Sequence, residues 1–74
     1  MEDYQKRMIE EYKELRNKID KLTVFLSRAT TLGNIGEEKY SLMQAQLYSM
    51  MAYAKILKMR MYLEKEIPAE EYES

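Results

Sequence analysis

The residues that break helices are confined to two places in this chain. Its two glycines are Gly33 and Gly36, and its single proline is Pro68. Helices tolerate glycine and proline least in their interiors, so each long segment between these residues can run as one uninterrupted helix. The sequence therefore constrains the fold to two long helices joined by a short connection.

Apolar residues of the first segment recur at alternating steps of four and three. They are Met8, Tyr12, Leu15, Ile19, Leu22, Leu26 and Ala29. This spacing places them on one face, which predicts a helix over about residues 3–28 that packs against a second helix.

Turn chemistry is concentrated in residues 29–36. Gly33 suits a left-handed residue that ends the first helix. The second helix is expected over about residues 37–66, stopped by Pro68. Residues 1–67 would then form one helical hairpin domain, and residues 68–74 a frayed acidic tail.

The predicted second helix has two apolar faces. One matches the first helix and consists of Tyr40, Met43, Leu47, Met50, Ala54, Leu57 and Met61. The other, which we call the outer face, consists of Leu42, Ala45, Ser49, Ala52, Ile56 and Met59. Only one face of a helix can meet its partner within a hairpin, so the outer face predicts another copy of the chain. The expected fold class is all-α, an antiparallel two-helix hairpin that assembles into a homo-oligomeric helical bundle.

The composition argues against enzyme and metal chemistry. The chain has no Cys and no His, which removes disulfides, the usual catalytic triads and the best zinc ligands. We therefore expect no catalytic residues, no metal site and no cofactor, and the protein is not expected to be an enzyme.

Charge and hydropathy restrict the partners. A formal net charge of −1 argues against nucleic-acid binding through many phosphate contacts. The longest uncharged run, residues 40–54, is fifteen residues and is too short and too polar to cross a membrane. The N-terminal segment is charged from its second residue, which argues against a secretory signal and favours a cytoplasmic location.

Tyrosine is the unusual aromatic residue, with seven Tyr against one Phe and no Trp. A buried tyrosine needs a hydrogen-bond partner, and an exposed ring can stack on a purine base. Hydroxyls and cations that could bind phosphate accompany them, namely Ser27, Arg28, Thr30, Thr31, Lys55, Lys58 and Arg60. Each residue also has a structural interpretation: the threonines can cap a helix, Arg28 can neutralise a helix end, and tyrosines are common at subunit interfaces.

The segment QLYSMMAYAKILKMR resembles the second helix of short phage-encoded helical hairpin proteins. Within that class, most of residues 4–63 is similar in plan to the sponge proteins that phages use against CBASS and Thoeris immunity. The resemblance implies a multimer, in the cytoplasm of an infected bacterial host cell, that sequesters cyclic di- or oligonucleotide second messengers at subunit interfaces without cleaving them.

The resemblance also implies which residues would hold the ligand. They are Tyr4 or Tyr12 on the first helix, Arg28, Thr30 and Thr31 at the hinge, and Tyr53 with Arg60 on the second helix. An alternative function stays open, in which the protein is a homo-oligomeric interaction module of a phage that docks on another protein and binds no small molecule.

Overall fold

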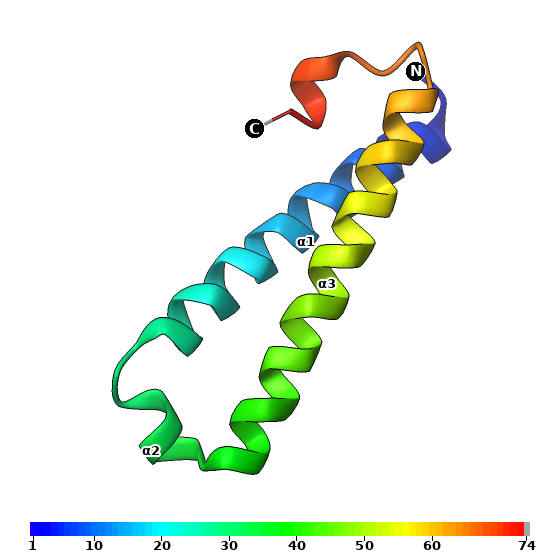
Figure 1. Cartoon of the computed structure of the whole chain (residues 1–74). Coiled ribbons are helices and arrows are strands. Elements are labelled where there is room, and N and C mark those ends of the chain that lie inside the picture. The colour runs from blue at the N-terminus through cyan, green and yellow to red at the C-terminus, as the bar shows by residue number, and fades with distance from the viewer. Residues whose placement is uncertain (74) are drawn as a thin grey trace.

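The structure is a computed structural model that describes residues 1–73. Its elements are α1 (Asp3–Ser27), α2 (Thr31–Ile35), α3 (Glu37–Leu63) and a short 3-10 turn, η1 (Ala69–Glu71). The two long helices run antiparallel, α2 closes one end of the hairpin, and both termini lie at the other end (Figure 1). The expectation of an all-α chain with two long helices is confirmed over these residues.

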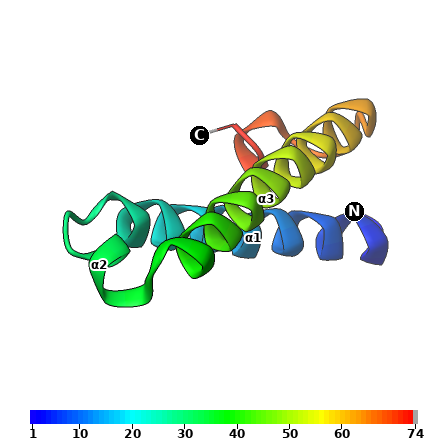
Figure 2. The ribbon, with the colours of Figure 1, turned by 60° about the horizontal axis from the view of Figure 1, so that its bottom comes forward.

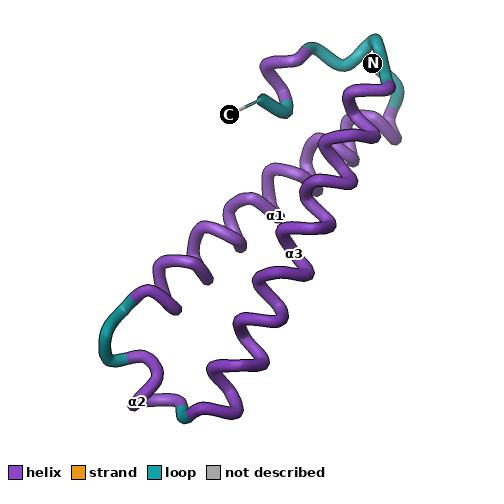
Figure 3. Tube along the Cα trace, viewed as in Figure 1, coloured by secondary structure: helices purple, strands orange, loops and turns teal. Residues whose placement is uncertain are grey.

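The molecule is elongated, with extents of 47 × 16 × 16 Å. The two long helices cross at an angle and do not run exactly side by side (Figure 2). Loops are short and occur between α1 and α2, at the start of α3, and on both sides of η1 (Figure 3). Within residues 1–73, neither long helix has a stretch that is apolar enough to span a bilayer.

The connection between the long helices contains a short helix of its own. Gly33 lies inside α2, and the residue with a positive φ is Gly36, at +86°, directly before α3. The left-handed role predicted for Gly33 was therefore wrong, because the backbone makes one more helical turn before it reverses. Glu37 and Glu38 occupy the first turn of α3, where they face the positive end of the helix dipole.

Two hydroxyl groups hold the hinge onto the end of α1. Thr31 donates a hydrogen bond from Oγ1 to the Phe25 carbonyl at 2.6 Å, and Tyr40 donates from its phenol to the Leu26 carbonyl at 3.0 Å. The last carbonyls of a helix have no partner within the helix. Tyr40 supplies one for Leu26, and Phe25 accepts Thr31 in addition to the backbone N–H of Arg28.

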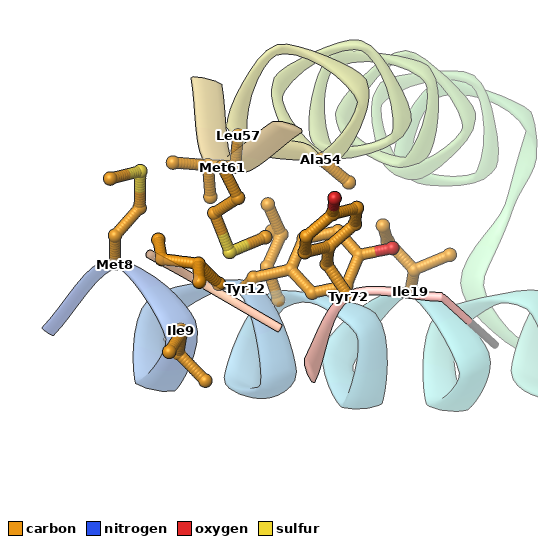
Figure 4. Packing of buried hydrophobic residues seen from close by; sticks show 10 residues of the cluster. Met8, Ile9, Tyr12, Ile19, Ala54, Leu57, Met61 and Tyr72 are labelled. Carbon is orange, nitrogen blue, oxygen red and sulfur yellow. The ribbon is translucent and has the colours of Figure 1, made fainter. Parts of the chain in front are cut away.

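The core lies in the half of the hairpin that contains the termini. α1 contributes Met8, Ile9, Tyr12, Leu15 and Ile19, α3 contributes Ala54, Leu57 and Met61, and the C-terminal segment contributes Ile67 and Tyr72. Figure 4 shows Met8, Tyr12, Leu57 and Met61 between the two helices, with Tyr72 of the C-terminal segment beside them. Towards α2 the facing residues, such as Leu22, Met43 and Leu47, are only half-buried. The single chain is therefore well packed at one end and more open at the other.

The C-terminal segment, residues 64–73, folds back onto α1; we call it the tail. Ile67 and Tyr72 are buried in the core, and Lys13 Nζ forms an ion pair with Glu71 Oε2 at 3.1 Å. The expectation of a frayed tail was therefore wrong, because two apolar side chains anchor the acidic segment.

α3 also ends at Leu63, earlier than predicted. Directly after this end, Gln5 Nε2 donates a hydrogen bond to Glu64 Oε2 at 3.1 Å. Ser74 of the predicted tail lies outside the described residues.

Candidate anion-binding site

A cavity of about 270 Å³ opens between the two long helices, beside the core. Its lining consists of Tyr12 and Arg16 from α1 and Met51, Ala54, Lys55 and Lys58 from α3. We call it the basic cleft. Figure 4 shows Tyr12 on α1 and Ala54 on α3, on the facing sides of the two helices.

Helical periodicity brings the lining residues together. Tyr12 and Arg16 are four residues apart, and Met51, Lys55 and Lys58 follow one another by four and three. Side chains at these spacings lie on one face of a helix. The antiparallel arrangement of α1 and α3 then sets the two faces against each other, so a regular hairpin is sufficient to build the cleft.

The cleft concentrates positive charge. Three of its six lining side chains are cations and none is a carboxylate. Among residues 1–73 the single ion pair is that of Lys13 with Glu71, so Arg16, Lys55 and Lys58 have no acidic partner within 4.0 Å. Arg16 is half-buried, and partial exclusion of water strengthens its attraction for an anion. The cleft can therefore bind a phosphate group, most effectively through the forked guanidinium of Arg16.

Three tyrosine hydroxyls are already engaged within the chain. Tyr40 holds the hinge as described above, Tyr4 donates to Glu64 at 3.1 Å, and Tyr53 donates to Glu11. Partial burial, followed by the hydrogen bond to Glu64, raises the pKa of Tyr4. The hydrogen bond to Glu11, followed by partial burial, raises the pKa of Tyr53, and the nearby Arg60 opposes this shift. Both phenols therefore remain protonated donors at neutral pH.

Two other tyrosines present free rings next to the basic cleft. Tyr48 is 66% exposed and Tyr62 is 67% exposed, whereas Tyr12 is 6% exposed and forms the floor of the cleft. Tyr48 precedes Met51 by three residues, and Tyr62 follows Lys58 by four, so both rings lie on the same strip of α3 as the cleft. At about 1.5 Å of rise per residue, each ring is within about 10 Å along the helix of a cleft lysine.

The residues implied by the family resemblance do not converge on one point of this chain. Tyr12 lines the basic cleft, whereas Tyr4 lies near the start of α1 against Glu64. Tyr53 contacts Glu11 and lies close to Arg60. Their spacing from Lys55 and Lys58 places Tyr53 and Arg60 on a different side of α3 from the cleft.

The hinge residues lie at the far end of the hairpin. Thr31 is buried and its hydroxyl is bonded to Phe25, while Thr30 is exposed and immediately precedes α2. Arg28 lines a separate opening of about 380 Å³ with Asp20, Lys21, Val24 and Phe25. Tyr4 and Arg28 are 24 positions apart, about 36 Å along α1, so one small ligand cannot contact both in the same chain. A single site that used all these residues would require more than one copy.

Arg16 of the cleft and the neighbouring tyrosines Tyr48 and Tyr62 were not among the sites inferred from sequence. Arg16 lies among the charged residues between the apolar positions of the first helix, a pattern typical of a solvated face, and the excess of tyrosine alone does not show which rings are free. The spacing of Tyr48, Met51, Lys55, Lys58 and Tyr62, alternately three and four, was the signal that could have found the α3 strip.

A family model named Sequestin matches residues 2–63. The chain belongs to the Sequestin family. The match contains α1, α2 and α3 with the whole basic cleft, and the tail lies beyond it. No curated protein and no solved structure shows a significant match.

Proposed function

We propose that this member of the Sequestin family is a phage sponge that binds cyclic oligonucleotide immune second messengers and retains them without cleavage. The family name denotes sequestration, which agrees with the resemblance to anti-CBASS and anti-Thoeris sponges. The observation that carries the proposal is the basic cleft, which combines three cations without an acidic partner with exposed aromatic rings.

The chemistry of the cleft fits a phosphodiester ligand. Phosphate oxygens would lie against Arg16, Lys55 and Lys58, and a base would stack on Tyr48 or Tyr62. The two rings are fourteen positions apart, about 21 Å along α3, so one small ligand would use one of them. Retention requires no reacting group, which suits a chain without His or Cys.

Self-association is part of the proposal. Every residue of the outer face of α3 is exposed in the single chain, including Leu42, Ile56 and Met59. A cleft of about 270 Å³ is also smaller than the usual range for ligand pockets, about 300–1,000 Å³. A second copy on the adjacent outer face would bury these apolar residues and enclose more of a ligand.

The test is a thermal-shift panel of cyclic di- and trinucleotides. A ligand at about 100 times its dissociation constant stabilises the folded state by about 2.7 kcal/mol, so a true ligand gives a clear shift. Arg16→Ala and the double variant Lys55→Ala/Lys58→Ala should each weaken binding about tenfold or more, because each removes a charge-assisted hydrogen bond. The matched control is Lys18→Ala/Lys39→Ala, which removes two cations outside the cleft and should bind almost normally.

Two results decide between sequestration and the alternatives. Ligand released by denaturation should have its original mass, since a sponge returns it intact. If no member of the panel shifts the melting temperature, the sponge proposal fails. The exposed outer face would then favour the other function, a homo-oligomeric interaction module without a small ligand.

A further inference from the structure

Two side chains of the basic cleft also line a cavity beside the acidic tail. A second cavity, of about 380 Å³, lies between α1 and the tail, and Tyr12 and Arg16 line both openings. Glu70, Glu71 and Glu73 line the tail side of this cavity. The carboxylates therefore lie along the edge of the same surface that would receive an anion.

Apolar contacts hold the tail in this place. Tyr72 is 8% exposed and Ile67 is 4% exposed, and Figure 4 shows Tyr72 against α1 beside Tyr12 and Ile19. The ion pair of Lys13 with Glu71 is exposed, and such pairs contribute little to stability. The anchors thus fix the segment. Among residues 1–73, Glu70 and Glu73 form no ion pair and can repel an anion that approaches Arg16, whereas Lys13 offsets part of the charge of Glu71.

From this geometry we propose that the tail is an electrostatic gate for the basic cleft. Its three carboxylates lower the affinity of the cleft for anions, and neutralising or displacing them raises it. This inference rests on the proposed function only in placing the anion site at Arg16, Lys55 and Lys58. The coupling is reciprocal, so an anion in the cleft also loosens the tail.

The effect has a calculable size. Three carboxylates about 10 Å from a dianionic ligand, screened at about 0.1 M salt, change its affinity by about fivefold. The change should be larger in dilute buffer and should nearly vanish at about 1 M salt, where the Debye length is about 3 Å.

The experiment uses the full chain and inorganic tripolyphosphate as the probe, with cyclic dinucleotides in parallel. The gate variant is Glu70→Gln/Glu71→Gln/Glu73→Gln, which keeps Ile67 and Tyr72. The control is Glu10→Gln/Glu14→Gln/Glu37→Gln, which removes as many charges from exposed positions that line neither the cleft nor the tail cavity. Titration calorimetry at low and high salt measures both affinities.

Tripolyphosphate carries about four negative charges at neutral pH, twice as many as a dianion, so the screened repulsion is doubled. We therefore expect the gate variant to bind it about twentyfold more tightly than the control variant at low salt, with no difference at high salt. Tyr72→Ala, which removes an anchor, should shift affinity in the same direction. Equal affinities for the gate and control variants would overturn the gate, as would no binding of tripolyphosphate by the gate variant. Binding of tripolyphosphate with no binding of any cyclic nucleotide would sink the proposed function and leave the gate standing.

Discussion

At the scale of single residues, the tyrosines divide by what their hydroxyls contact. The excess of tyrosine was visible in the sequence, but the sequence did not show which rings were free. Tyr53 and Tyr4 are bonded to carboxylates, whereas Tyr48 and Tyr62 are exposed on the strip of α3 that borders the basic cleft. Helical periodicity fixes which face a residue occupies, but not which side chains from distant segments approach it.

The raised pKa of Tyr53 leads to a prediction about stability at high pH. The pKa of Tyr53 is higher in the folded chain than in the unfolded chain, so the protonated phenol stabilises the fold below about pH 10. This contribution is lost as the pH rises through the pKa of the folded chain. The melting temperature of the wild type should therefore fall more steeply above about pH 10 than that of Tyr53→Phe. Tyr62→Phe is the control, because it also removes a phenol but one whose hydroxyl forms no hydrogen bond among residues 1–73. Equal slopes for the wild type and Tyr53→Phe would contradict the role of the Glu11 contact.

At the scale of elements, the two long helices could be predicted because their apolar residues repeat at helical spacing over many turns. The positions that were missed have a common physical cause. α2, the early end of α3 and the folded tail all depend on contacts between segments distant in sequence, such as Tyr40 with Leu26 and Tyr72 with the core. Local patterns carry no information about those contacts, so the hinge and tail could not be placed from sequence.

The two glycines of the hinge should respond differently to the same substitution. Gly36→Ala should lower the free energy of unfolding by about 1–3 kcal/mol, because the φ of +86° and ψ of 161° suit only glycine. Gly33→Ala should raise it by about 0.5–1 kcal/mol, because Gly33 is helical. A Cβ at either position would meet nothing within 4 Å, so backbone conformation alone decides the sign. Urea unfolding measures both, and destabilisation by Gly33→Ala would contradict the α2 assignment.

At the scale of the whole molecule, the single chain leaves much apolar surface in water. The two apolar faces of the second helix indicated this in the sequence, and the structure shows which of them is covered within the single chain. Ala54 is buried and Met43, Leu47 and Met50 are half-buried against α1, whereas the outer face is exposed along the length of α3. At about 25 cal/mol per Å², covering several large side chains would contribute several kcal/mol to an assembly.

Self-association predicts a clear effect of charge on the outer face. Ile56→Glu should convert the assembly to monomers, because a buried carboxylate without a partner is strongly unfavourable. Light scattering coupled to size exclusion gives the mass directly. The control is Lys65→Glu, a charge change at an exposed position beyond α3, which should leave the mass unchanged. A wild-type protein that is monomeric at all concentrations would contradict self-association.

The position of the core at the end of the hairpin that contains the two termini has a consequence for folding kinetics. A helical hairpin usually gains its first tertiary contacts next to the turn, where little chain has to be closed into a loop. Here the turn end is the less buried one, and the contacts that complete the core join residues as far apart as Gln5 and Glu64, 59 positions along the chain. A large loop must close before such contacts can form, and the entropy lost in closing it slows folding. The chain should therefore fold more slowly than its helical content suggests, with a transition state that forms where its two ends meet.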